Sequence, residues 1–179
     1  MMRVITGSAR GRRLETLPGD DVTRPTSESV KEALFSMLQF DIEGKRVLDL
    51  FAGSGQLGIE ALSRGAHECV FVELDKNARA IVERNISKCG FSKVSRVIPA
   101  NAENYAASCP AFDIVFLDPP YNKGLVMKVL PLLENRVNEN ALIVCETAST
   151  EELPESIGSL NVIRKKRYGK TRITLYRKD

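Results

Sequence analysis

Residues 112–121 read Phe-Asp-Ile-Val-Phe-Leu-Asp-Pro-Pro-Tyr, an apolar run that ends in a carboxylate, two prolines and an aromatic ring. Such a run is typical of a parallel strand that is buried on both faces of a sheet. The prolines of Asp118-Pro119-Pro120-Tyr121 can continue neither a strand ladder nor a helix, so regular structure must stop there. In open α/β sheets, ligands bind at the carboxyl ends of the strands. The stretch therefore predicts a ligand site or, taken alone, only a stiff turn with Tyr121 packed on the next helix.

Strand and helix patterns alternate on both sides of this stretch, from Lys45 to about residue 146. Short apolar runs alternate with segments of helical spacing, and the connections are short. This order predicts a doubly wound, mostly parallel α/β sheet with right-handed crossovers. At the end of the chain, Tyr168-Gly169-Lys170 separates two β-rich runs and predicts an antiparallel hairpin. We expect strands at 47–51, 68–73, 94–98, 112–117, 141–146, 161–167 and 171–177, and helices at 56–64, 76–88, 103–107 and 125–133.

The first 43 residues carry a different pattern. Residues 3–6 and 12–15 flank a glycine-rich turn, 7–11, which predicts a short hairpin with Arg10 at its tip. A helix is expected after Arg24-Pro25-Thr26, with Thr26 as its N-cap. Apolar residues then recur at helical spacing, so this helix should dock on the rest of the chain. We therefore divide the chain into an N-terminal extension, residues 1–43, and a main domain, residues 44–179.

Length and composition are those of an ordinary globular protein. The chain has 179 residues, 43% hydrophobic and 27% charged, which suits one domain. We find no apolar run near the roughly 20 residues of a membrane span and no signal-peptide pattern, and we expect a cytoplasmic protein. Because the cysteines are far apart and His67 is the only histidine, we expect reduced, packed thiols and neither a metal site nor a Ser-His-Asp triad. The cysteines are Cys69, Cys89, Cys109 and Cys145.

The net charge is only +3, but basic residues gather at both ends of the chain. Arginines at positions 3, 10, 12 and 13 precede the first acid, Glu15. Two basic ends around a neutral middle predict a polyanionic partner such as a nucleic acid. The alternative is that these residues are solvated faces of edge strands, where lysine and arginine discourage aggregation. The C-terminal group consists of Arg164, Lys165, Lys166, Arg167, Lys170, Arg172, Arg177 and Lys178.

A glycine-rich loop follows the first strand of the alternation, where residues 49–58 read Asp-Leu-Phe-Ala-Gly-Ser-Gly-Gln-Leu-Gly. Gly53 and Gly55 allow a sharp turn close to a ligand, and Gly58 allows close packing of the next helix. Glu73 ends the next strand, where an acid can accept ribose hydroxyls. The spacing also matches the G-x-G-x-x-G fingerprint of dinucleotide sites, which keeps a nicotinamide-dependent oxidoreductase open. Asp49 favours instead a ligand with a cationic group, such as an amino-acid ammonium.

Together, the glycine-rich loop and the Asp-Pro-Pro-Tyr motif resemble the class I S-adenosylmethionine-dependent methyltransferases, and more narrowly the amino-methyltransferases. Nearly the whole chain resembles the RsmD family, the bacterial 16S ribosomal RNA guanine-N2 methyltransferases. That resemblance implies a seven-stranded sheet and a short N-terminal extension. Gln56 stands where a small residue is expected and Lys31 where arginine is expected. Asn101 replaces an acid that often meets the adenine amino group, although an asparagine carbonyl can still accept that hydrogen bond. The resemblance lies in residues 7–11, 24–26, 32–35, 49–55, 60–66, 118–121 and 167–169.

The resemblance implies methyl transfer from S-adenosylmethionine to the exocyclic N2 amine of a guanine in small-subunit rRNA. Asp118 and the carbonyl of Pro119 would each accept one amine N–H, and the carboxylate would stabilise the charge that develops on nitrogen. Tyr121 would stack on the base, which must be unpaired or extruded to reach the pocket. The implied catalytic residues are Asp118, Pro119, Pro120 and Tyr121; the cofactor residues are Asp49, Phe51, Gly53, Gly55, Glu73, Asn101 and Ala102; and the candidate RNA residues are Arg10, Arg24, Tyr168 and Arg172.

Alternatives stay open on the residues alone. The pocket motif does not separate guanine from adenine, so an adenine-N6 methyltransferase acting on RNA or DNA is the first. An oxidoreductase would need a hydride-transfer acid, which neither His67 nor a tyrosine–lysine pair near the motif supplies. A non-catalytic RNA-binding module would explain the basic ends but not the two strand-end carboxylates, Asp49 and Asp118. We expect ribosomal RNA in a small-subunit particle as the partner, no membrane contact, no metal and a monomeric enzyme.

Overall fold

The structure is a computed structural model that describes residues 2–18 and 28–179. Its α-helices are α2 (Glu28–Met37), α3 (Gln56–Ser63), α4 (Lys76–Cys89), α5 (Ala102–Ser108) and α6 (Leu125–Leu133), and its 3-10 helices are η1 (Ser92–Val94) and η2 (Glu134–Arg136). Its strands are β1 (Arg46–Asp49), β2 (Glu68–Val72), β3 (Ser95–Ile98), β4 (Phe112–Leu117), β5 (Val137–Ala148), β6 (Ser156–Ile157), β7 (Leu160–Tyr168) and β8 (Thr171–Lys178).

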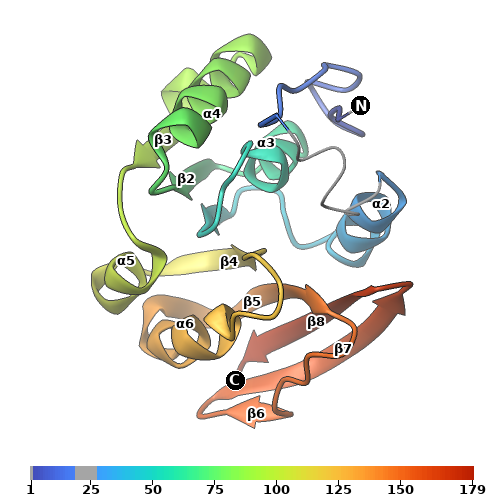
Figure 1. Cartoon of the computed structure of the whole chain (residues 1–179), viewed down its shortest axis with the longest axis vertical. Helices are drawn as coiled ribbons and strands as arrows, with labels where there is room; N and C mark the ends of the chain where they lie inside the picture. Colours follow the sequence, from blue (N-terminus) through green and yellow to red (C-terminus); the bar gives the residue numbers. More distant parts are fainter. Residues whose placement is uncertain (1, 19–27) are drawn as a thin grey trace.

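In the described part of the chain, all of these strands join one eight-stranded sheet in the order β3-β2-β1-β4-β5-β8-β7-β6. From β3 to β5 in this order the neighbours pair in parallel, and from β5 to β6 they pair antiparallel. Figure 1 shows α2, α3 and α4 on one face of the sheet and α5 and α6 on the other. The doubly wound α/β fold and the antiparallel C-terminal hairpin are therefore confirmed. The seven expected strands are present, and the short edge strand β6 is an eighth.

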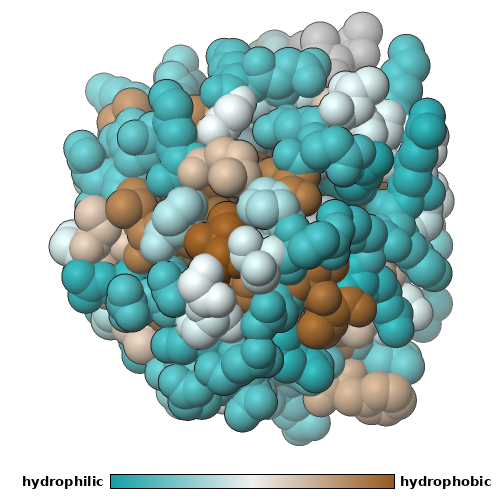
Figure 2. Space-filling model, turned by 90° about the horizontal axis from the view of Figure 1, so that it is seen from below, coloured by the Kyte–Doolittle hydropathy of each residue, from teal (hydrophilic) through white to brown (hydrophobic). Residues whose placement is uncertain are grey.

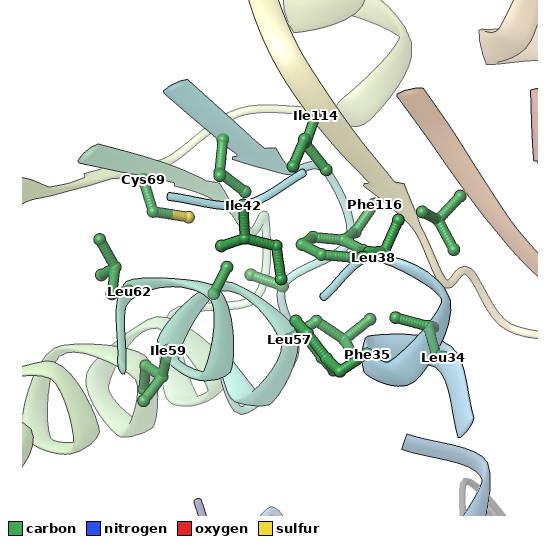
Figure 3. Packing of buried hydrophobic residues seen from close by; sticks show 14 of the residues in the cluster. Leu34, Phe35, Leu38, Ile42, Leu57, Ile59, Leu62, Cys69, Ile114 and Phe116 are labelled. Carbon is green, nitrogen blue, oxygen red and sulfur yellow. The ribbon is translucent and has the colours of Figure 1, made fainter. Parts of the chain in front are cut away.

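The strands send alternate side chains into two hydrophobic clusters, one on each face of the sheet. The first cluster lies under α2, α3 and α4 and receives Val47, Phe71 and Phe116. The second cluster lies under α5 and α6 and receives Leu48 and Val115 from the same strands. Figure 3 shows side chains of α2 and α3 packed against the sheet within the first cluster. Because both faces of the central strands are covered, their sequences are continuously apolar rather than alternating.

The predicted N-terminal hairpin is present, but its strands are reduced to one antiparallel bridge between Arg3 and Arg13. The amide of Val4 donates to the carbonyl of Arg12 at 2.9 Å. The amides of residues 5, 6, 8 and 9 instead donate to Glu60 and Ser63 of α3. An amide that is bonded to a helix cannot also pair across a hairpin, so the strand ladder is lost.

The helix predicted after the hairpin is α2, and its apolar stripe packs as expected. Val30, Leu34 and Leu38 are buried in the first cluster. The segment Arg24-Pro25-Thr26, which includes the predicted cap Thr26, lies outside the described residues. Residues 2–18 and α2 share the first cluster with the sheet, so the described part of the extension packs on the main domain. The boundary at residue 43 stays a prediction.

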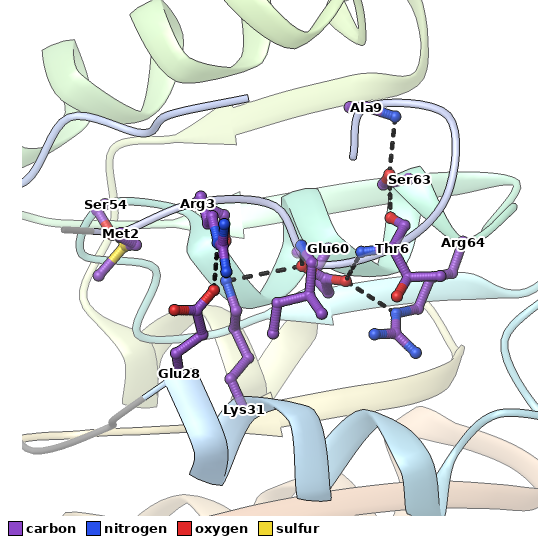
Figure 4. Close-up of polar contacts among 12 residues, drawn as sticks. Met2, Arg3, Thr6, Ala9, Glu28, Lys31, Ser54, Glu60, Ser63 and Arg64 are labelled. Carbon is purple, nitrogen blue, oxygen red and sulfur yellow. Dashed lines mark hydrogen bonds and ion pairs between the residues drawn. The ribbon is translucent and has the colours of Figure 1, made fainter. Parts of the chain in front are cut away.

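A buried charged network ties the N-terminal segment, α2 and α3 together (Figure 4). Glu60 of α3 is fully buried, and its carboxylate accepts from the amides of Ile5 at 2.8 Å and Thr6 at 3.0 Å. The carboxylate also accepts from Nε of Arg64 at 2.9 Å, and Nζ of Lys31 lies 3.6 Å from it. Burial lowers the pKa of Lys31, and the charge of Glu60 opposes that shift. A buried carboxylate needs such donors because its desolvation is otherwise very costly.

Ser63 of α3 holds the glycine-rich turn, residues 7–11, close to the helix. Oγ of Ser63 donates to the carbonyl of Thr6 at 2.6 Å and accepts from the amide of Ala9 at 2.9 Å. Gly7 has a φ of +89°, and a Cβ at this position would fall 1.7 Å from the carbonyl oxygen of Ser63. Only glycine therefore permits both the backbone conformation and the close approach.

All four cysteines are free and buried, as the sequence predicts. Cys69 lies in β2 and Cys145 in β5, whereas Cys89 ends α4 and Cys109 follows α5. Burial raises the pKa of each thiol above its ordinary value. The cysteines therefore pack as small apolar side chains.

The surface on the side of β6 is mostly hydrophilic, with a smaller hydrophobic area among polar side chains (Figure 2).

Within residues 2–18 and 28–179, no helix has the length and apolar character to cross a membrane. The same residues contain no group of three or more His, Cys, Asp or Glu side chains arranged for a metal ion.

Candidate functional site

The two sequence motifs leave neighbouring strands at the same edge of the sheet. β1 pairs in parallel with β4, and Asp49 lies opposite Phe116 in this pairing. The amide of Leu50 donates to the carbonyl of Phe116 at 3.1 Å, so the two chains stay paired up to the start of the glycine-rich loop. Carboxyl ends of adjacent parallel strands are where ligands bind in open α/β sheets. The structure thus brings the glycine-rich loop and Asp118-Pro119-Pro120-Tyr121 together, as predicted.

The glycine-rich loop needs glycine for two different reasons. Gly53 and Gly55 have φ values of +56° and +80°, in the left-handed region that disfavours other residues. Gly55 is the N-cap of α3, and Gly58 lies inside the helix. A Cβ on Gly58 would come within 2.3 Å of the Phe71 ring, so this glycine lets α3 lie directly on the sheet. The predicted packing role of Gly58 is confirmed.

Asp49 is buried, with 1% of its surface exposed. Its Oδ2 accepts from the amide of Gly58 at 3.0 Å. The first turn of a helix presents amides without partners in the helix, and a carboxylate there is favoured by the helix dipole. One oxygen of Asp49 therefore holds α3 to the end of β1. This bond gives the residue a structural role in addition to the predicted role toward a cationic ligand.

Glu73 connects β2 to the glycine-rich loop. Its Oε2 accepts from the amide of Gly53 at 2.9 Å, and its Oε1 accepts from the amide of Asp75 at 2.9 Å. Asp75 in turn caps α4 by accepting from the amide of Ala78 at 2.8 Å. Each oxygen of the Glu73 carboxylate keeps a further lone pair, so the side chain can still accept ribose hydroxyls.

A cavity of about 150 Å³ opens beside Glu73 at the ends of β1, β2 and β3. Four of the predicted cofactor residues line it, namely Phe51, Glu73, Asn101 and Ala102, whereas Asp49, Gly53 and Gly55 do not. Apolar walls with a few polar groups suit a nucleoside, because the flat base needs apolar contact and the ribose needs an acceptor. The remaining lining residues, which the sequence reasoning missed, are Leu50, Val72, Leu74, Ala100, Glu103 and Leu125.

Leu74 gives the clearest missed signal among these residues. It is 62% exposed and lies two residues after the buried strand β2. An apolar side chain next to a strand-end acid, as in Glu73-Leu74, suggests a surface that a ligand covers. The sequence pattern alone does not separate this reading from an ordinary exposed leucine.

Asn101 caps α5, and this alters its expected role toward an adenine. Its Oδ1 accepts from the amides of Glu103 at 2.9 Å and Asn104 at 3.2 Å. A carbonyl oxygen has two lone pairs, and both are used here. The expectation that this carbonyl accepts the adenine amino group stays a prediction, and that contact would compete with the two capping bonds. The group that Asn101 can still offer a ligand is its Nδ2 amide, which is a donor.

The Asp-Pro-Pro-Tyr motif forms the turn between β4 and α6. Asp118 is 5% exposed and Pro119 is buried, whereas Pro120 is exposed and Tyr121 is half-buried. The hydroxyl of Tyr121 donates to Oε1 of Glu146 at 2.6 Å and lies 3.0 Å from Oγ1 of Thr171. Burial, together with the charge of Glu146, raises the pKa of Tyr121. The Tyr121 side chain is therefore bonded to strands β5 and β8 of the sheet, a contact that the alternative of a stiff turn with Tyr121 on the next helix did not include.

The candidate RNA residues lie in different surroundings. Arg10 is exposed on the glycine-rich turn. Tyr168 is half-buried and packs against the first cluster. Arg172 donates to the carbonyl of Glu151 at 3.2 Å and pairs with Glu152 at 2.5 Å. Arg24 lies outside the described residues.

Tyr168 and Arg172 are placed near the motif by the sheet. β8 begins opposite the end of β5, where Thr171 pairs with Ala148. β5 is parallel to β4, so its carboxyl end lies at the same edge as Asp118. The basic hairpin and the motif therefore share one edge of the sheet.

The fold and the site define the class of protein: a Rossmann-like class I methyltransferase with the sequence Asp-Pro-Pro-Tyr after β4. Residues 2–177 match the family described as conserved hypothetical protein 95. The chain belongs to this family, which is the RsmD family.

Individual relatives match along most of their length. YlbH of Bacillus subtilis is 42% identical, covering 99% of this chain and 99% of YlbH. Ribosomal RNA small subunit methyltransferase D of Escherichia coli is 36% identical, covering 99% of this chain and 90% of the relative. The solved structure of yhhF from Escherichia coli has a TM-score of 0.87 and 34% identity, covering 99% of this chain and 98% of that one. The N-terminal segment is thus part of the shared fold.

Proposed function

We propose that the protein transfers a methyl group from S-adenosylmethionine to the exocyclic N2 amine of a guanine in 16S ribosomal RNA. The observation that carries the proposal is the placement of Asp118 and Pro119, at the end of β4, beside the glycine-rich loop of β1. The cavity next to Glu73, with its apolar walls and strand-end carboxylate, supports the cofactor. Family membership supports the substrate, since the relative from Escherichia coli is named ribosomal RNA small subunit methyltransferase D.

The residues of the cavity would hold the cofactor by its nucleoside. Glu73 would accept the ribose hydroxyls, Phe51 and Ala102 would contact the base, and Asn101 would donate from its Nδ2 amide. Asp49, Gly53 and Gly55 shape the loop that would face the rest of the cofactor, beyond its nucleoside. When bound, the cofactor supplies a methyl group that is electrophilic because it is carried by a sulfonium.

Asp118 and Pro119 act on the amine. An exocyclic amine is a poor nucleophile, because its lone pair is delocalised into the ring of the base. The Asp118 carboxylate and the Pro119 carbonyl each accept one of its N–H groups, which directs the lone pair away from both oxygens. As positive charge develops on nitrogen, the carboxylate stabilises it, and removing one preorganised electrostatic contact of a transition state typically costs about 10²–10³ in kcat. Pro120 keeps the turn rigid, and Tyr121 stacks on the base.

The RNA contacts that we propose come from both ends of the chain. Arg10, Arg24, Tyr168 and Arg172 are the proposed contacts, together with the exposed lysines and arginines of β7. Contacts from lysine and arginine to phosphates position an RNA without reading its sequence. We further propose that the enzyme acts as a monomer on RNA within a small-subunit particle.

The test is incubation with methyl-labelled S-adenosylmethionine and small-subunit particles or naked rRNA that lack the modification, followed by nucleoside analysis. Label in N2-methylguanosine is the expected result. Label in N6-methyladenosine would keep the role of Asp118 and overturn the choice of base. No label on either substrate, from protein that binds S-adenosylhomocysteine, would overturn rRNA as the substrate.

Two variants test the role of Asp118. Asp118→Ala should lose at least about 10²-fold in kcat and keep its affinity for S-adenosylhomocysteine, measured by calorimetry. Asp113→Asn is the matched control, because Asp113 lies at the opposite end of β4 and bonds to Arg46 and Asn138. The control should keep kcat. Full activity of Asp118→Ala would refute the amine-holding role.

A further inference from the structure

We propose that Glu146 and Thr171 are positioning residues that hold the Tyr121 ring in the orientation in which it stacks on the target base. This inference rests on the proposed function and adds to it two residues outside the Asp-Pro-Pro-Tyr motif. It also gives the Tyr121 hydroxyl a role in catalysis, although that hydroxyl does not touch the reacting atoms.

Tyr121 sits in a turn that does not orient its ring by regular structure. The turn runs from the end of β4 at Leu117 to the start of α6 at Leu125. Asn122 has a φ of +60° and Gly124 of +63°, so the backbone directly after the tyrosine is neither helical nor extended. The hydrogen bonds recorded for the Tyr121 side chain are those of its hydroxyl, to Glu146 and Thr171. Those two bonds therefore fix the direction of the ring.

The two partners are themselves fixed by the sheet. Glu146 pairs with Ile173 and Ala148 pairs with Thr171, so Glu146 and Thr171 are diagonal neighbours on β5 and β8. Because side chains alternate along a strand, both point to the same face of the sheet. The anchor of Tyr121 is therefore built on two paired strands and not on another loop.

The hydrogen-bond donors and acceptors among Thr171, Tyr121 and Glu146 can be assigned without conflict. The Tyr121 hydroxyl donates to the Glu146 carboxylate at 2.6 Å, which is the short distance of a charge-assisted bond. With its proton directed at Glu146, the tyrosine oxygen accepts from the Thr171 hydroxyl at 3.0 Å. Each hydroxyl thus donates once along the line Thr171 to Tyr121 to Glu146.

Burial makes this arrangement more than a surface contact. Glu146 and Thr171 are each 1% exposed. A carboxylate at this depth is unfavourable unless donors satisfy it, and an apolar side chain would suit the neighbouring cluster better. The Tyr121 hydroxyl is one donor to this buried carboxylate, so the bond lies in a desolvated site where hydrogen bonds are strong.

The kinetic test is a double-mutant cycle with kcat on the rRNA substrate as the readout. Tyr121→Phe and Glu146→Gln should each lower kcat, by about 10- to 100-fold for the complete loss of the hydroxyl. The KM for S-adenosylmethionine should stay unchanged. In the Tyr121→Phe background, Glu146→Gln should have less than a twofold further effect, because the bond it weakens is already gone. Additive effects in this cycle, or full kcat in Tyr121→Phe, would overturn the inference.

Variants of β8 separate positioning from general damage to the sheet. Thr171→Val should lower kcat, whereas Thr171→Ser, which keeps the hydroxyl, should restore it. Thr174→Val is the matched control, because Thr174 is equally buried in β8 and its hydroxyl has no hydrogen-bond partner among the described residues. The control should keep kcat. An equal loss in the Thr171→Val and Thr174→Val variants would show a structural effect and overturn the inference.

A structural readout makes the test independent of the proposed function. In protein with ring-labelled tyrosine, the Tyr121 signal, assigned with Tyr121→Phe, should shift or broaden in Thr171→Val and Glu146→Gln and stay in place in Thr174→Val. An unchanged signal in the first two variants would overturn the anchor, whether or not the wild-type enzyme methylates rRNA. A shifted signal in an enzyme without rRNA activity would leave the anchor standing and reject the substrate.

Discussion

Replacing Glu60 by glutamine tests how the N-terminal segment is held to α3. The wild-type carboxylate accepts from two backbone amides and from Arg64, and lies 3.6 Å from Nζ of Lys31. In Glu60→Gln one oxygen becomes an NH₂ group of the same size, so a donor must face at least one donor. The substitution also removes the negative charge beside two cations, one of which, Lys31, is only 2% exposed. No atom is lost, and the effect is therefore one of polarity.

The expected loss of stability follows from these contacts. Losing a hydrogen bond to a charged group costs about 1.5–3 kcal/mol. Leaving one member of a buried ion pair without its partner costs about 3–5 kcal/mol. The two terms describe the same side chain and do not add, so we expect a decrease of about 3–5 kcal/mol in the free energy of unfolding. Burial already lowers the pKa of Lys31. Without Glu60 the lysine can lose its proton more easily, so the deficit should shrink as the pH is raised toward 10.

The assay is equilibrium unfolding in urea, combined with amide hydrogen exchange. The amides of Ile5 and Thr6 should lose protection in Glu60→Gln, while those of β1 and β4 keep theirs at low denaturant. Lys31→Met/Glu60→Gln is the matched control, because it removes the unpaired cation and should recover part of the loss. A change below about 1 kcal/mol in Glu60→Gln, which is the range of a surface ion pair, would refute the reasoning.

Three further predictions concern the loop, the cavity and the basic surface. Gly58→Ala should destabilise the protein by about 1–3 kcal/mol in urea unfolding, because the new methyl group overlaps the ring of Phe71; a neutral result would mean that α3 can move away from the sheet. Asn101→Asp should bind S-adenosylhomocysteine about 3- to 10-fold more tightly in calorimetry, since one carboxylate oxygen can cap α5 while the other accepts from the adenine; unchanged affinity would exclude this contact. Arg10→Ala should weaken rRNA binding and reduce the slope of log K against log salt by about 1, and an unchanged slope would place Arg10 outside the interface.

Elements whose pattern is local were predicted well from the sequence. The helix expected at 125–133 is α6, with the same bounds despite Pro131 within it. The apolar run 112–117 is β4. β5 was predicted at 141–146 but begins at Val137. The early start was missed because Asn138-Glu139-Asn140 is polar and exposed and shows no strand pattern. Its early pairing with β4 depends on the partner strand, which no local pattern reveals.

In the site, too, residues that follow a local pattern were predicted, whereas their partners were not. Strand-end positions such as Glu73 and Asp118 can be read from alternation, because each follows an apolar run. The partners of these residues come from other parts of the chain. Glu146 is 25 residues from Tyr121 and Thr171 is 50 residues from it, and only the sheet order brings them together. The double capping bond of Asn101 was missed for another reason, since an asparagine before a helix is equally typical of a cap and of a ligand contact.

The burial of the four thiols has a consequence for how the enzyme can be followed in solution. A thiolate is the form that reacts with alkylating agents, and burial disfavours it at each of the four positions. Alkylation of the native protein should therefore proceed through opening of the structure. Cys69 and Cys145, in the central strands, would report global unfolding, whereas Cys89, at the end of α4, would report fraying of that helix. The wild-type chain thus carries its own reporters of local and global opening.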